Sequence, residues 1–164
     1  MTLQGYDYTT ADFATLLLQK FYPEKTTQES GVLRDYLLEY LPTFDRISLT
    51  VRVGEGHTPD PTLPPKIQKQ QKFVTQRRMD ALAWRGTQPV IVEAKYLVTP
   101  SALGQILGYR QLLREELPDA PEPDLVIVGR ACDPETLRIL QSHGVTVILY
   151  PEAQPPGAAA GGGV

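Results

Sequence analysis

Two stretches near the start of the chain carry apolar residues at the spacing of one helix face. Residues 10–21 begin with Thr and Asp and predict a first short helix. The apolar stripe of the second stretch consists of Val32, Leu33, Tyr36, Leu37, Tyr40 and Leu41. Thr26 or Thr27 can cap this second helix, and Pro42 marks its end.

Later stretches change to the patterns of β-strands. Residues 46–53 alternate between apolar and polar side chains, which predicts a half-buried strand. A strand pattern resumes from Lys72 and continues to Trp84, and a turn at 85–88 leads into an apolar strand over 89–98. The run 123–129 is typical of a strand buried on both faces, and 145–150 predicts a last strand.

Helix signals separate these last strands. Thr99 and Pro100 resemble a cap and a first helical residue, opening a helix to about Glu116. A further helix begins at Asp133 and Pro134 and ends at Gly144. Strands joined by short turns pair antiparallel, whereas strands joined through a helix are parallel. We therefore expect an α/β fold with a mixed central sheet flanked by helices.

The expected domain organisation is simple. With 164 residues the chain is long enough for one core, which we assign to residues 1–151. Residues 54–72 are rich in Gly, Pro and Lys and predict a long mobile basic loop, and loops of this length are often functional or disordered. Residues 152–164 are rich in Pro, Ala and Gly and predict a disordered tail.

Composition narrows the class of protein. No run of residues reaches the roughly 20 apolar positions of a membrane span, and the first residues lack the pattern of a signal peptide, so a cytoplasmic protein without membrane contact is expected. The single Cys132 excludes a disulfide within the chain and a cysteine-rich metal site.

Charge is unevenly distributed, although the net charge is only −3. Residues 61–79 contain no acidic residue. They contain five basic ones: Lys66, Lys69, Lys72, Arg77 and Arg78. A solvated basic loop and a loop that contacts phosphates explain this segment equally well.

Two charged residues interrupt the apolar strand over 89–98. Glu93 and Lys95 are two residues apart and therefore project to the same face. If Trp84 lies opposite Pro89 across the turn, counting along both strands places Asp80 opposite Glu93. A surface ion pair would be an ordinary explanation of each charge alone, but the apolar flanks argue for burial.

Two neighbouring carboxylates repel each other unless a proton or a cation lies between them. Mg²⁺ prefers oxygen ligands from carboxylates, backbone carbonyls and water. Asp80, Glu93 and the backbone carbonyl of Ala94 therefore form a candidate site for Mg²⁺ or Mn²⁺.

These residues resemble a known family. RRMD, twelve further residues and EAK resemble the Asp and Glu-x-Lys elements of the PD-(D/E)XK nuclease superfamily, with Met79 where Pro would stand. QILGY places Gln105 and Tyr109 on one helix face and is similar to the QxxxY element of the RecB and lambda-exonuclease-like subset. An amphipathic helix in which Tyr109 only packs is the alternative. Glu29 matches the acidic residue on the helix before the sheet, with Glu39 as a less favoured competitor.

The resemblance implies a restriction-endonuclease-like αβββαβ core with a C-terminal αβ extension. It also implies metal-dependent hydrolysis of phosphodiester bonds, with DNA as the expected substrate. Asp80, Glu93 and the Ala94 carbonyl would hold the metal, with Glu29 acting directly or through water. Lys95 would act as a base or stabilise charge, and Gln105 and Tyr109 would position it or the DNA backbone.

Several functional questions stay open at the level of sequence. The chain could be a catalytically inactive member of the same fold that binds nucleic acid or serves assembly. If it is a nuclease, cleavage at ends or within strands, and a preference for DNA or RNA, are equally undecided. A homodimer or a protein partner could supply specificity.

Overall fold

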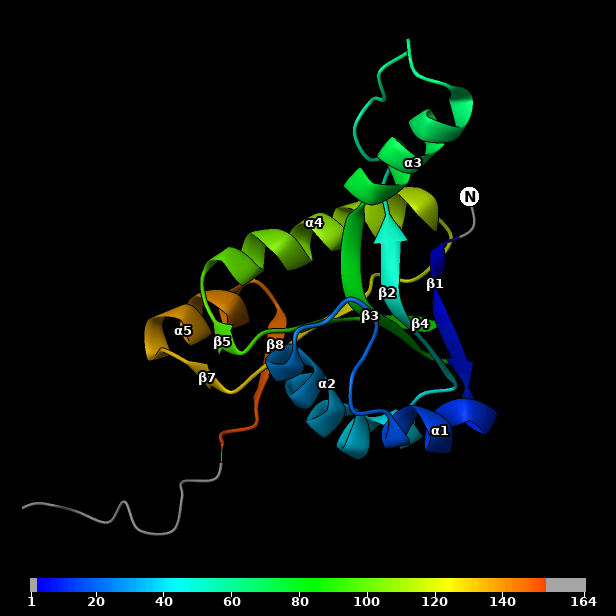
Figure 1. The fold of residues 1–164 in the computed structure, drawn as a ribbon. Helices are drawn as coiled ribbons and strands as arrows, with labels where there is room; N and C mark the ends of the chain where they lie inside the picture. Colours follow the sequence, from blue (N-terminus) through cyan, green and yellow to red (C-terminus); the bar gives the residue numbers. More distant parts are fainter. Residues whose placement is uncertain (1–2, 153–164) are drawn as a thin grey trace, which may run out of the picture.

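The computed structural model describes residues 3–152 as a β-sheet with helices on both faces (Figure 1). The strands are β1 (Gln4–Thr9), β2 (Arg46–Val53), β3 (Arg77–Arg85), β4 (Gln88–Ala94), β5 (Leu97–Val98), β6 (Asp124–Gly129), β7 (Ala131–Cys132) and β8 (Val145–Leu149). The α-helices are α1 (Phe13–Leu18), α2 (Thr27–Tyr40), α3 (Pro65–Thr75), α4 (Ser101–Glu116) and α5 (Pro134–Ser142). Two short 3₁₀ turns are η1 (Thr10–Asp12) and η2 (Leu41–Thr43).

The central sheet has six strands in the order β1-β2-β3-β4-β6-β8. The strands from β1 to β4 pair antiparallel, whereas β4, β6 and β8 pair parallel. This mixed α/β sheet confirms the predicted three-strand meander and the two crossovers through α4 and α5. The predicted register is also correct, because Trp84 pairs with Pro89.

Each face of the sheet has its own hydrophobic core. The α2 core lies beneath α1 and α2 and includes Leu16, Leu33, Leu37, Ala81, Val90 and Val92. The α4 core lies beneath α4 and α5 and includes Leu82, Ile91, Ile106, Tyr109, Ile127 and Leu140. The apolar stripe predicted for the second helix is the side of α2 that is buried, and Thr26 is its N-cap, so this part of the prediction is confirmed.

The pairing of β2 with β3 is interrupted at one residue on each strand, Thr50 and Asp80. The flanking pairs are intact: Leu49 with Ala81 and Val51 with Met79. Residues two apart in a strand normally share a face, yet the first pair contacts the α2 core and the second the α4 core. Thr50 has a φ of 56°, an outlier for a β-branched residue. Asp80 therefore lies at the position where the alternation of side chains between the two faces of the sheet is reversed in both strands.

Several sequence-based assignments are wrong or incomplete. The segment predicted as a loop over 54–72 contains most of the helix α3, whose Lys and Gln residues are good helix formers and whose first residue is Pro65. This helix continues to Thr75, so the strand predicted from Lys72 begins only at Arg77. Strand β1 was not expected because its residues are polar and mostly exposed. Backbone pairing with β2, a hydrogen bond from Ser48 to Asp7 and the packing of Tyr8 against the α2 core hold it in place. The first helix is shorter than 10–21, since a 3₁₀ turn precedes α1 and the helix ends at Leu18.

The strand predicted over 89–98 also divides in two. Strand β4 ends at Ala94, and Leu97–Val98 forms β5, which pairs with β7 in a separate two-stranded sheet. Gly129, the last residue of β6, lies directly beneath this change of direction. A Cβ at Gly129 would lie 2.5 Å from the Val98 side chain and 3.2 Å from the Lys95 carbonyl oxygen, so only glycine lets the two segments approach this closely.

Residues 54–76, which include α3, form an arm that projects from the body of the molecule (Figure 1). Its base is held by two hydrogen bonds: the backbone N–H of His57 donates to Thr75 Oγ1 at 2.8 Å, and the Gln76 amide donates to the Gly54 carbonyl at 2.7 Å. The base of the predicted loop is thus an ordered structure.

None of the helices within residues 3–152 combines the length and the apolar character that crossing a membrane would need. Of the tail predicted over 152–164, only Glu152 belongs to the described residues, and residues 153–164 lie outside them.

We expect Gly129→Ala to destabilise the protein by about 1–3 kcal/mol, because its methyl group would overlap Val98 in a packed region. Urea unfolding followed by circular dichroism measures this change in the free energy of unfolding. Gly104→Ala is the matched control: Gly104 lies in α4 with open space around it, so this change should be stabilising by about 0.5–1 kcal/mol. Equal stabilities of the two variants would contradict the close approach at Gly129.

Candidate active site

Two carboxylates are buried side by side at the end of the β3–β4 hairpin. The last pair in register is Ala81 with Val92, and Asp80 and Glu93 are the next residues on their strands. Asp80 is 5% exposed and Glu93 only 1%. Burying charged groups so completely is costly unless each is paired or hydrogen-bonded, so their contacts determine what this site can do.

Asp80 uses both of its carboxylate oxygens. Oδ2 accepts a hydrogen bond from the backbone N–H of Ala94 at 2.8 Å, across the hairpin. Oδ1 forms an ion pair with the Nζ of Lys25, a residue just before the N-cap of α2. The N–H of Ala94, not its carbonyl, is therefore the group that contacts Asp80, and a ligand role for the Ala94 carbonyl stays a prediction.

Glu93 uses only one of its oxygens. Oε1 lies 2.7 Å from the Nζ of Lys95, whereas Oε2 is buried without any hydrogen-bond partner. Burial, followed by the nearby charge of Asp80, raises the pKa of Glu93 to about 7, even though Lys95 and Lys25 oppose the rise. Glu93 is thus a buried side chain with one oxygen that makes no hydrogen bond, and it is protonated more readily than a carboxylate in water.

Lys95 is held in its charged form. Burial by itself would lower its pKa, but the charge and hydrogen bond of Glu93, with Asp80 and Glu29 adding to them, outweigh burial and raise the pKa above its usual value. An ammonium group with a raised pKa is suited to stabilising negative charge and poorly suited to accepting a proton. Of the two roles considered for Lys95, this arrangement favours charge stabilisation.

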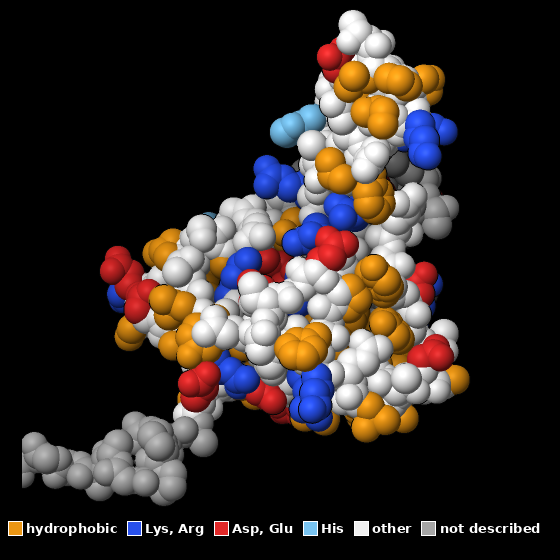
Figure 2. Space-filling model, viewed as in Figure 1, with side chains coloured by type: hydrophobic (Ala, Val, Ile, Leu, Met, Phe, Trp, Pro, Cys, Tyr) orange, Lys and Arg blue, Asp and Glu red, His pale blue; other side chains and the backbone are white. Residues whose placement is uncertain are grey.

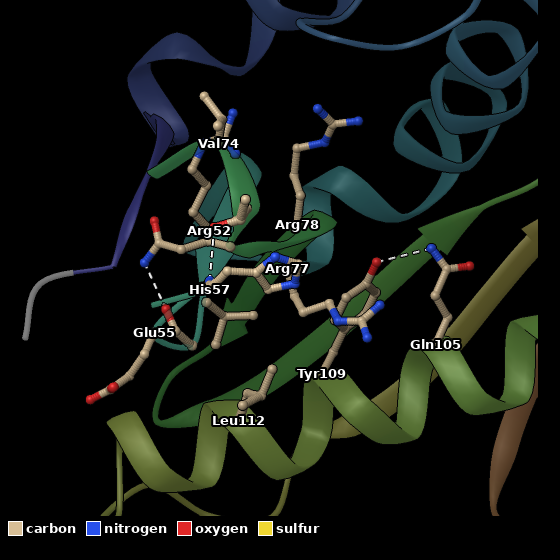
Figure 3. A pocket seen from close by; sticks show the side chains of 14 residues that line it. Arg52, Glu55, His57, Val74, Arg77, Arg78, Gln105, Tyr109 and Leu112 are labelled. Atoms are coloured by element: carbon tan, nitrogen blue, oxygen red, sulfur yellow. Dashed lines mark hydrogen bonds between the residues drawn. The ribbon is translucent and has the colours of Figure 1, made fainter. Parts of the chain in front are cut away.

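Gln105 and Tyr109 lie on the same face of α4, as their spacing predicts. The Gln105 side-chain amide donates to the Tyr109 hydroxyl at 3.0 Å (Figure 3). Tyr109 is also part of the α4 core, so packing and polar contact coexist in this residue. Burial, followed by the charge of Glu93, raises the pKa of Tyr109, while its bond to Gln105 lowers it less. Tyr109 therefore stays a neutral hydroxyl within reach of the charge of the carboxylates.

The two acidic candidates on α2 have other contacts. Glu29 closes a capping box with Thr26, accepting from its hydroxyl at 3.0 Å, and its charge reaches Lys95 without touching it. A direct metal-ligand role for Glu29 is not supported by this position, and a water-mediated one stays a prediction. Glu39 accepts a hydrogen bond from Tyr150 at 2.8 Å, which accounts for this competing residue by a structural contact.

A groove of about 680 Å³ lies between the base of the arm and α4. It is lined by Arg52, His57, Arg77, Arg78, Gln105 and Tyr109, among others (Figure 3). Arg77 extends toward Tyr109, whereas Arg78 points away from it (Figure 3). Lys and Arg side chains gather where the arm meets the body of the molecule (Figure 2). The charges of Glu93, Asp80 and Arg77 all affect the pKa of Tyr109. Tyr109 therefore lies between the groove that it lines and the two carboxylates.

The structure separates the five basic residues predicted to contact phosphates. Arg77 and Arg78 line the groove, but Lys66, Lys69 and Lys72 lie on α3 and are not part of its lining. Arg52 lines the groove as well and was not predicted. It pairs in register with Arg78 on the neighbouring strand, so the strand pairing of β2 with β3 was the signal that could have identified it.

The carboxylates provide a chemically suitable but small set of metal ligands. Within the described part of the chain, no group of three or more His, Cys, Asp or Glu residues could hold a metal ion. The orphaned Oε2 of Glu93 is nevertheless the kind of hard oxygen ligand that Mg²⁺ and Mn²⁺ prefer, and it lies beside a second carboxylate. The residues therefore fit a divalent cation that completes its coordination with water or substrate oxygens.

The raised pKa of Glu93 predicts how stability depends on pH in EDTA. The folded protein retains the Glu93 proton up to about pH 7, whereas the unfolded chain releases it near its ordinary value. Stability from this group is therefore fully present below about pH 4.5 and lost as the pH rises to about 7.

Relative to Glu93→Gln, the original protein should lose roughly 1–3 kcal/mol between pH 5 and pH 7.5. Urea unfolding at several pH values measures the difference between the two proteins, which cancels the titration of the groups that do not interact with Glu93. Glu115→Gln, on the exposed side of α4, is the control and should leave the pH dependence unchanged. A constant difference between the original protein and Glu93→Gln would contradict a raised Glu93 pKa.

Comparisons with other proteins do not assign this chain to a family. No family model matches it, and neither a curated protein nor a solved structure matches it.

Proposed function

We propose that the protein is a metal-dependent nuclease that hydrolyses the phosphodiester bonds of DNA. One observation carries the proposal: Glu93 is almost fully buried beside Asp80, yet its Oε2 has no partner. A protein rarely leaves a buried charged oxygen unsatisfied without a functional reason. A divalent cation shared by the two carboxylates would satisfy this oxygen and remove their mutual repulsion.

The surroundings of the carboxylates suit phosphoryl chemistry. When bound, Mg²⁺ or Mn²⁺ makes a water molecule more acidic and neutralises charge on the phosphate. Asp80 and Glu93 would hold the ion, and the Lys95 ammonium, 2.7 Å from Glu93, would stabilise negative charge that develops during hydrolysis. The Tyr109 hydroxyl and the Gln105 amide would orient the nucleic-acid backbone at the groove.

The basic groove supports a polyanionic substrate. Three arginines, Arg52, Arg77 and Arg78, line it, with Glu55 as the acidic residue of the same lining. Glu24 pairs with Arg52 and Arg78, which leaves Arg77 as the groove arginine without an ion-pair partner among residues 3–152. Arg77 is exposed and is therefore the best placed of the three to contact a phosphate.

The order of elements also supports the nuclease assignment. The succession α2, β2, β3, β4, α4 and β6 agrees with the αβββαβ core of the PD-(D/E)XK superfamily, and α5 with β8 would be its C-terminal extension. Asp80 and Glu93 lie on the β3–β4 hairpin, Lys95 follows it directly, and Gln105 and Tyr109 lie on the next α-helix, which is the order expected of the Asp, Glu-x-Lys and QxxxY elements. Strand β1 and the arm would be additions to that core.

We expect the protein to cut linear, single-stranded or branched DNA with Mg²⁺ or Mn²⁺ and to be inactive in EDTA. Asp80→Asn and Lys95→Ala should each lower the cleavage rate by roughly 100-fold or more, because each removes a group that binds or neutralises charge at the reacting phosphate. Gel assays with labelled substrates of each shape measure the rate. Circular dichroism verifies folding, and Glu115→Gln, exposed on α4, is the matched carboxylate control.

The same assay addresses the alternative that this is a catalytically inactive module that binds nucleic acid. Metal-independent DNA binding without cleavage on any substrate would overturn the nuclease proposal and support that alternative. RNA substrates in parallel reactions test the preference for DNA.

We expect Arg77→Gln to weaken DNA binding several-fold and to reduce the slope of log affinity against log salt by about 1, because one phosphate contact is lost. Fluorescence anisotropy in EDTA over a series of salt concentrations measures both quantities without cleavage. Arg138→Gln, at an exposed position on α5, is the matched control and should bind like the original protein. An unchanged salt slope for Arg77→Gln would place the DNA outside the groove.

A further inference from the structure

We propose that Lys25 is a resident counter-ion of the carboxylate site, which a divalent cation must displace from Asp80 in order to bind. This inference depends on the proposed function, since it concerns how that site accepts its metal. It assigns a positioning and gating role to a residue outside the Asp, Glu-x-Lys and QxxxY elements. The role follows from the burial of Lys25, from the way its segment is anchored, and from the use of each carboxylate oxygen.

The ion pair between Lys25 and Asp80 is an interior contact. The side chains of Lys25 and Asp80 are 4% and 7% exposed. Burying an ammonium group removes its hydration, so an accidental surface contact would not bring it here. Lys25 is thus built into the site together with Asp80.

The segment before α2 is anchored in a way that directs Lys25 inward. The Thr50 hydroxyl donates to the Pro23 carbonyl at 2.9 Å, and the Glu24 carboxylate pairs with Arg52 and Arg78. Glu24 has a φ of 57°, in the left-handed region that side chains rarely adopt, as does Thr50. Two strained residues that both support the Lys25 segment are what is expected where a fold maintains a functional geometry.

Thr50 connects this segment to the carboxylate site. It is the residue of β2 at the interruption opposite Asp80, so the same bend in the sheet both turns Asp80 and holds Pro23. The position of Lys25 against Asp80 is therefore a consequence of the sheet itself.

The contacts of the carboxylate oxygens indicate which lysine a bound cation would displace. Asp80 Oδ2 is committed to the Ala94 N–H, so Oδ1, the oxygen paired with Lys25, is the one a metal ion would need. Glu93 offers Oε2 while Oε1 remains with Lys95. A cation held by Asp80 and Glu93 would therefore compete with Lys25 for Asp80 and would leave the contact between Lys95 and Glu93 unchanged.

Charge balance supports the same conclusion. Two carboxylates and the two ammonium groups of Lys25 and Lys95 can neutralise one another. Adding a divalent cation to both lysines would leave the buried cluster with excess positive charge, which is unfavourable away from water. Because the Lys25 ammonium is carried on a flexible four-carbon side chain, it can move away from Asp80 and relieve this excess.

Calorimetric titration of the protein with Mn²⁺ alone, at pH 8 and without nucleic acid, tests the inference. Lys25→Met should bind Mn²⁺ more tightly than the original protein, by roughly tenfold or more, because no ammonium has to be displaced and couplings between close charges are large. Lys25→Met should also show a larger rise in Tm on adding Mn²⁺, since its carboxylates lack a partner in EDTA. Lys20→Met, an exposed lysine of the same region, is the matched control and should behave like the original protein.

Labelling the original protein provides a second test that does not depend on how a variant folds. Acetic anhydride should modify Lys25 weakly in EDTA and at least several-fold more in Mn²⁺, with the exposed Lys66 and Lys69 as internal references in the mass spectrum. If Mn²⁺ binds but Lys25 labelling is unchanged, or if Lys25→Met binds Mn²⁺ no more tightly, Lys25 is not displaced and the inference is overturned. If neither protein binds Mn²⁺ and neither cuts DNA, the proposed function fails, and this inference fails with it.

Discussion

Desolvation of two adjacent carboxylates is the constraint on which the site and the elements around it depend. Asp80 and Glu93 lie almost entirely out of water, where each charge needs a partner and where the two repel each other. Three groups meet this demand: a backbone N–H across the hairpin, Lys95 directly after the strand that carries Glu93, and Lys25 in the segment before α2. One oxygen of Glu93 still lacks a partner, and this deficit is the physical basis for proposing a bound cation.

The bend in the sheet at Thr50 and Asp80 relates the carboxylates to the groove. Beyond this bend, the end of β2 and the start of β3 carry Arg52 and Arg78. These two residues pair in register and line the groove at the base of the arm. The same bend receives the segment that presents Lys25 and Glu24, and Glu24 pairs with both of these arginines. The carboxylate site, the groove and the segment before α2 therefore all contact the same interruption in the pairing of β2 with β3.

Much of the fold could be predicted because its signals are local. The helical stripe of α2, the cap of α5 by Asp133, the antiparallel meander and the pairing of Trp84 with Pro89 each follow from residue spacing within a short segment. The helix α3 was missed because Gly and Pro in the first half of the loop obscured good helix formers in the second half. Strand β1 has no apolar pattern at all, since backbone pairing at a sheet edge needs none.

By itself, the sequence determined that Asp80, Glu93 and Lys95 meet on one hairpin and that Gln105 and Tyr109 share a helix face, because strand and helix periodicities are properties of the backbone. Only the tertiary structure decided that Lys25, 55 residues before Asp80, neutralises it and that Arg52 rather than the lysines of α3 lines the groove. These contacts join segments distant in sequence. Their geometry depends on how the sheet bends and which charges remain unpaired after the cores have packed, and no local pattern records that outcome.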